Sequence, residues 1–70
     1  MPITLAPLNE EITVIKVLTD EKQKKHLESL GLLPNAKVTV LSSNNGGVVI
    51  LVKDGRLALD RNISSKIFVA

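Results

Sequence analysis

His26 is the only histidine of this 70-residue chain, and imidazole is the side chain most often used to bind transition metals. A metal-binding histidine on a helix needs further ligands three or four residues away. Those positions hold poor ligands for iron or zinc, namely Lys22, Gln23, Ser29 and Leu30. The chain also has no cysteine that could supply a thiolate. We therefore expect no metal site, and we expect His26 to be a structural or contact residue at the rim of its helix.

The carboxylates are the other side chains that could recruit a cation. Glu10 and Glu11 are adjacent, and neighbouring residues of an extended strand point to opposite faces. These two carboxylates therefore cannot chelate one ion. Together with Glu21 and Glu28, they are expected to form solvated surface.

The chain lacks the sequence patterns of nucleotide binding or nucleophilic catalysis. Gly46-Gly47 is not followed by lysine and then serine or threonine, as a phosphate-binding loop requires. The serines share one histidine and have no oxyanion motif. Arg56 is a conceivable arginine finger for a GTPase, but it lies beside a predicted turn and is expected to be an exposed, solubilising residue. We predict a protein that is not an enzyme, has no catalytic residue and needs no cofactor.

Length and composition indicate one small domain, residues 1–70, with 44% hydrophobic residues and a formal net charge of +2. Phe68 is the only aromatic residue, so neither an aromatic groove for proline-rich peptides nor a stacking platform for nucleic acids is expected. No apolar run is long enough to span a membrane, and the N-terminus has no signal-peptide pattern. We expect a soluble cytoplasmic protein.

About five short strands and one helix must position these residues. Alternating apolar residues predict strands at 11–18, 36–43, 48–53, 56–60 and Ile67–Val69. Asp20 is predicted to cap a helix over residues 21–30. Leu27 and Leu30 are expected to face inward, and Gly31 can adopt the left-handed conformation that ends a helix.

Asp54-Gly55 is typical of a two-residue hairpin loop, and such a loop determines which side chains share a face. It predicts that Val52 lies opposite Leu57 and that Ile50 lies opposite Leu59. The face expected to fill the interior then carries five apolar residues, Val48, Ile50, Val52, Leu57 and Leu59.

The opposite, outward face of the same hairpin is also apolar, with Val49, Leu51 and Ala58. Two explanations are open. The N-terminal segment covers this face through Ile3 and Leu5, or the face binds a partner.

These elements predict a mainly β domain, a small and partly open β-barrel with the helix between strands 1 and 2. A strand followed by a helix also begins a parallel crossover unit. The two later hairpins, with turns at residues 44–47 and 54–55, argue against that arrangement.

The order of residues resembles the FeoA family, the ferrous iron transport protein A group. That family has a leucine-glycine helix end followed by proline and a strand of alternating valines, then a leucine-alanine-leucine strand and a final isoleucine-x-valine strand. The matching segments here are 30–40, 52–59, Ile67–Val69 and the opening Ile3–Leu5. Asn35 replaces the usual glycine after proline, and Asp60-Arg61 stands where arginine is expected directly after leucine. The resemblance covers almost the whole chain and implies an SH3-like barrel.

The resemblance implies a small cytoplasmic accessory protein of bacterial ferrous iron uptake. Its implied partner is the membrane permease FeoB, which has a cytoplasmic GTPase domain and which this protein binds and regulates. We expect partner contacts at the helix end and on the outward strand face, through His26, Leu32, Val49, Leu51 and Ala58. Neither a nucleic-acid partner nor insertion into the membrane is expected.

Three alternatives remain open. One is an RNA-binding SH3-like barrel, suggested by Lys22, Lys24, Lys25, Lys37, Lys53 and Lys66. Its binding should weaken steeply with salt, and the nearly balanced charge counts against it. Another is the SH3-like domain of a metal-dependent regulator, where the same aliphatic motif occurs. The third is an iron chaperone with a ferrous site near His26.

Overall fold

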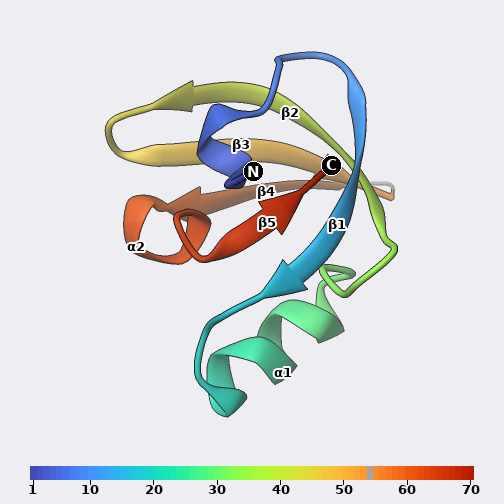
Figure 1. The fold of residues 1–70 in the computed structure, drawn as a ribbon, viewed down its shortest axis with the longest axis vertical. Coiled ribbons are helices and arrows are strands. Elements are labelled where there is room, and N and C mark those ends of the chain that lie inside the picture. The colour runs from blue at the N-terminus through green and yellow to red at the C-terminus, as the bar shows by residue number, and fades with distance from the viewer. Residues whose placement is uncertain (54) are drawn as a thin grey trace.

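The computed structural model describes residues 1–53 and 55–70, which form five strands and three helical segments (Figure 1). The strands are β1 (Glu11–Val17), β2 (Lys37–Asn44), β3 (Gly47–Val52), β4 (Gly55–Asp60) and β5 (Ile67–Val69). The helices are the 3-10 helix η1 (Ile3–Leu5), α1 (Glu21–Ser29) and α2 (Arg61–Ser64). The predicted strands and α1 agree with the observed ones to within one residue at each end.

All five strands belong to one sheet with the order β4-β3-β2-β1-β5, and each neighbouring pair is antiparallel. Figure 1 shows the sheet curling around the interior, with α1 (teal) at one end. Because β4 and β5 are the two outer strands, the barrel stays open between them. The prediction of a mainly β, partly open SH3-like barrel with its main helix between β1 and β2 is confirmed.

The β3–β4 hairpin has a register that differs from the predicted one. Val52 pairs with Gly55 and Ile50 pairs with Leu57, so the predicted pairs are wrong. Gly55 belongs to β4, while Asp54, the other residue of the predicted loop, lies outside the described residues. The register differs by two residues, and strand side chains alternate with a period of two. Every side chain therefore keeps its predicted face.

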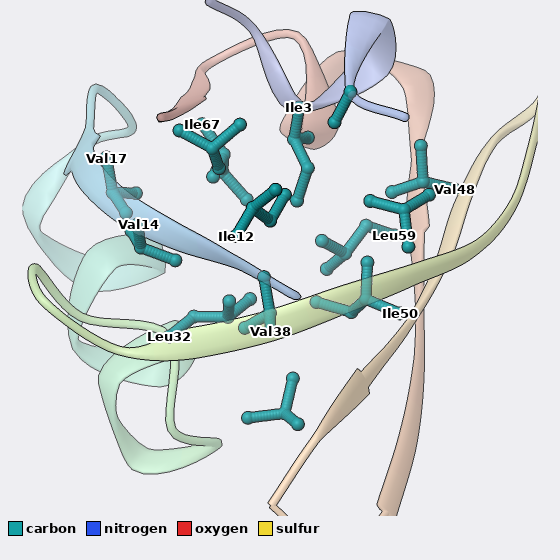
Figure 2. Packing of buried hydrophobic residues seen from close by; sticks show 14 of the residues in the cluster. Ile3, Ile12, Val14, Val17, Leu32, Val38, Val48, Ile50, Leu59 and Ile67 are labelled. Atoms are coloured by element: carbon teal, nitrogen blue, oxygen red, sulfur yellow. The ribbon is translucent and has the colours of Figure 1, made fainter. Parts of the chain in front are cut away.

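The interior face of this hairpin is as predicted. Val48, Ile50, Val52 and Leu59 are buried, and Leu57 is half-buried against them. Figure 2 shows how side chains from β1, β2 and β3 meet in one cluster with Leu32. On the outward face, Val49 is half-buried while Leu51 and Ala58 are exposed. This face is therefore only partly covered.

The N-terminal segment fills the barrel and does not cover its outward face. Ile3 is fully buried, and Figure 2 shows it among core side chains, with Ile67 on one side and Leu59 on the other. Leu5 is 71% exposed. Of the two explanations for this apolar face, cover by Ile3 and Leu5 is therefore wrong.

The same segment covers the outer edge of β5. Pro2 forms a bridge with Phe68, and the amino group of Met1 donates a hydrogen bond to the carbonyl of Val69 (3.0 Å). The N–H of Val69 donates in return to the carbonyl of Met1 (2.8 Å). The first and last segments of the chain therefore lie side by side, as Figure 1 shows.

Helix α1 begins at the predicted cap and lies across one end of the barrel. The N–H of Gln23 donates to Oδ1 of Asp20 (2.8 Å), and the helix ends before Gly31, which has φ +99°. Leu27 is the one fully buried side chain of the helix. Leu30, predicted to face inward, is instead 40% exposed, and it lies just beyond the helix as its C-cap residue.

The short helix α2 was not predicted, because residues 64–65 suggested only a turn. Asp60 caps it, since the N–H of Ile63 donates to Oδ1 of Asp60 (2.8 Å). This gives Asp60 a structural reason to stand directly after the leucine of β4. An aspartate three residues before an apolar residue is the signal that the sequence offered.

Loss of the α1 cap gives the first testable prediction. Asp20→Ala removes the acceptor of the Gln23 N–H and should lower the free energy of unfolding by about 1 kcal/mol. Urea denaturation followed by circular dichroism measures this difference. Asp20→Ser is the control, because serine retains a capping oxygen and should keep most of the stability. Equal losses in both variants would contradict a capping role.

Candidate partner-binding groove

The segment between α1 and β2 is held in place by backbone hydrogen bonds. The N–H of Leu32 donates to the carbonyl of Leu27 in α1 (2.9 Å). The N–H of Asn35 donates to the carbonyl of Val14 (2.8 Å), and the N–H of Val14 donates to the carbonyl of Ala36 (2.8 Å). The segment is therefore docked on β1, and its exposed side chains are held in a defined position.

Two left-handed residues shape this segment, Gly31 at φ +99° and Asn35 at φ 76°. The sequence indicated that both can adopt this conformation, and the structure confirms it. A Cβ atom on Gly31 would lie 2.9 Å from Cγ1 of Val52, so the end of the helix lies directly against the β3–β4 hairpin. This contact brings the segment and β3 to the same surface.

Between the segment and the β2–β3 hairpin lies a groove of about 580 Å³. Leu33 and Pro34 line it from the segment, and Leu51 lines it from β3. Leu33 is 42% exposed and Leu51 is 39% exposed, so two large apolar side chains meet water in one place. A hollow of this volume with apolar lining is of the size that binds small ligands or partner side chains.

Charged side chains stand around this groove. Lys37 and Lys53 line it together with one carboxylate, Glu11. Nζ of Lys37 donates to Oγ1 of Thr13 on β1 (2.7 Å), which holds that ammonium group beside the groove. The lining therefore combines apolar surface with a small excess of positive charge.

The structure separates the residues that the sequence proposed as partner contacts. Leu51 lies in the groove, whereas Val49 and Ala58 pair across β3 and β4 and line a neighbouring hollow of about 180 Å³. His26 is exposed on α1 and lines neither hollow. Leu32 is fully buried in the core, so the expectation that it is available at the surface is wrong.

Sequence reasoning missed Leu33 and Lys53 as parts of the same surface as Leu51. The available signal was the pair of left-handed positions around Leu33, which predicts a bent segment with outward side chains. What the sequence could not give is the docking of this segment beside β3.

Across residues 1–53 and 55–70, no three or more histidine, cysteine, aspartate or glutamate side chains are grouped so that they could hold a metal ion. Over the same residues, no helix is both long and apolar enough to cross a membrane.

Comparison with known proteins agrees with the fold and identifies the family. The model of the FeoA domain family matches residues 1–70. The chain belongs to the FeoA domain family. It is 31% identical over 68 residues to "Putative Fe(2+) transport protein A" of Methanocaldococcus jannaschii, a match that covers 97% of this chain and 83% of that protein. FeoA membership supports a role in ferrous iron transport.

Two solved FeoA structures superpose on the barrel. A crystal structure of an iron uptake regulatory protein, FeoA, has a TM-score of 0.86 at 26% identity and covers 99% of this chain and 93% of its own. The solution structure of the FeoA protein from Chlorobium tepidum has a TM-score of 0.85 at 22% identity. It matches 99% of this chain and 68% of its own, and it supports the fold alone. The likeness to both FeoA structures extends across nearly the whole barrel of this chain.

Proposed function

We propose that this chain is a cytoplasmic accessory protein of ferrous iron uptake that binds a FeoB-type permease and regulates it. The proposal places the contact at the groove between the α1–β2 segment and β3. The observation that carries it is the exposure of Leu33 and Leu51 together in that groove, in a chain of the FeoA family.

The chemistry of the groove suggests what it recognises. Leu33 and Leu51 offer apolar contact, and Lys37 and Lys53 outnumber Glu11 around them. We therefore expect the groove to take a segment of the permease's cytoplasmic region that carries an aliphatic residue and an acidic residue. Val49, Ala58 and His26 remain proposed contacts outside the groove.

Titration of the permease's cytoplasmic region with this protein tests the proposal. Leu51→Asp places a charge in the apolar part of the groove and should weaken binding by about tenfold or more. Because Leu51 is already 39% exposed, the barrel should still fold. Isothermal titration calorimetry measures the affinity, and circular dichroism checks the fold.

Leu18→Asp is the matched control. Leu18 is 56% exposed and does not line the groove, so this variant should bind as the wild type does. Equal weakening by both variants would show that the groove is not the contact. If the protein binds neither the isolated cytoplasmic region nor the permease in membranes, the proposed partnership is wrong. Val49→Asp tests separately whether the neighbouring hollow, which Val49 and Ala58 line, contributes to binding.

A further inference from the structure

The two outer edges of the sheet differ. The edge of β5 is covered by the N-terminal segment, through the Pro2–Phe68 bridge and the hydrogen bonds between Met1 and Val69. Among the residues that the structure describes, β4 has one hydrogen-bonded neighbour, β3. An uncovered edge strand presents backbone N–H and C=O groups to any strand laid beside it.

The strand register identifies which backbone groups β4 presents. Gly47 lies opposite Asn44 at the end of the β2–β3 hairpin, so its backbone groups face β2. The backbone N–H and C=O groups of a strand alternate in direction from one residue to the next. The backbone groups of Val48, and of every second residue after it, therefore face β4. Their partners on β4 are Gly55, Leu57 and Leu59. The backbone groups directed away from the sheet therefore belong to Arg56, Ala58 and Asp60, and of these the carbonyl of Asp60 already accepts the first hydrogen bond of α2.

The side chains of these three residues are exposed and form a self-complementary pattern. They run from a cation, Arg56, through the small Ala58 to an anion, Asp60, whose Oδ1 caps α2 and whose second oxygen can face a partner. If two copies of β4 lie antiparallel about a two-fold axis through Ala58, Arg56 of each copy lies opposite Asp60 of the other. Opposite charges at directly facing positions stabilise a strand pair.

From this pattern we propose that the chain forms a symmetric dimer in which β4 pairs with β4 of a second copy. Other registers that align the outward backbone groups lose the charge match. An axis through Arg56 places two arginines opposite each other, and an axis through Leu57 places Arg56 opposite Ala58. The charges on this edge therefore select one arrangement and disfavour the others.

The surface beside β4 fits this arrangement. Leu57 is half-buried, and it lines a hollow of about 170 Å³ with Leu30, which is 40% exposed. A second strand along β4 lies next to Leu57 and reduces its contact with water. Pairing occupies β4 of both copies while each β5 edge is covered, so assembly stops at two copies. The dimer leaves Leu51 on the outward face of β3 and does not depend on the proposed function, but it uses Ala58, so Ala58 can contact the permease only in the monomer.

Sedimentation equilibrium over a concentration series tests the dimer. The wild type should show a reversible monomer–dimer equilibrium. Arg56→Glu places like charges opposite each other at two positions and should raise the dissociation constant roughly tenfold. Lys22→Glu makes the same change of charge on the exposed face of α1 and should leave the constant unchanged. A wild type that stays monomeric up to millimolar concentration overturns the proposal, as do equal effects of the two variants.

The residue on the two-fold axis gives a second, register-specific test. Ala58→Lys and Ala58→Glu each place like charges across the axis, so each variant alone should dimerise more weakly than the wild type. An equimolar mixture places opposite charges across the axis and should form a heterodimer more tightly than either variant dimerises. Because Ala58 is exposed, both variants should fold, which circular dichroism checks. A mixture that associates no better than its components overturns the pairing of β4 through Ala58.

Discussion

Gly47→Ala is expected to remove most of the protein's stability. Gly47 has φ +135°, and a Cβ atom there would lie 1.9 Å from the carbonyl oxygen of Leu59 and 3.0 Å from backbone atoms of Asp60. Backbone atoms of a paired strand cannot move aside as a flexible side chain can. We expect a loss of about 3 kcal/mol or more, against a net stability of about 3–5 kcal/mol for so small a core.

Gly55→Ala is the control for this prediction. A Cβ atom on Gly55 meets nothing within 4 Å, and its backbone needs no left-handed conformation. We expect a change within about 0.5 kcal/mol. Urea denaturation and the far-ultraviolet circular dichroism spectrum compare the two variants. A Gly47→Ala variant as stable as Gly55→Ala would mean that β3 and β4 do not approach as closely as described.

Ile3→Ala should cost about 2–5 kcal/mol, because Ile3 is fully buried and its removal leaves a cavity between β3 and β5. A loss of this size consumes most of the stability expected for the domain. Chemical denaturation should show a marked decrease in the midpoint concentration. Xenon or a small apolar molecule should also bind the cavity in any folded fraction.

Leu5→Ala is the matched control within the same 3-10 helix. Leu5 is 71% exposed, so its truncation should change the free energy of unfolding by less than about 0.5 kcal/mol. If both variants lose equal stability, the N-terminal segment acts through its backbone pairing with β5. If neither variant loses stability, the side chain of Ile3 does not contribute to the stability of the core.

The strands and α1 could be predicted because their signals are local. Alternating valines mark β2, and Asp20 and Gly31 mark the two ends of α1. The faces of the β3–β4 hairpin were also predictable, since a register difference of two residues leaves every side chain on its face. Local patterns therefore determine the elements and their buried sides.

Positions that depend on non-local contacts could not be predicted from the sequence. Leu32 follows a left-handed glycine, where helical periodicity no longer predicts the direction of a side chain. Its side chain lies in the core, and its N–H donates to the carbonyl of Leu27. Ile3 is an ordinary apolar residue in sequence, and its place in the core depends on strands formed far along the chain. The groove likewise requires Leu33 and Leu51 to meet from separate elements.

The adjacency of the two ends of the chain has a consequence for how the domain folds. The amino group of Met1 and the carbonyl of Val69 are joined across a sequence separation of 68 residues, and β1 also pairs with β5. Such contacts close the longest loops available to the chain, so they raise contact order and slow folding. During synthesis, β1 lacks its outer neighbour and Ile3 lacks Ile67 until β5 has left the ribosome. We therefore expect the barrel to close only once β5 is available, in a single late step.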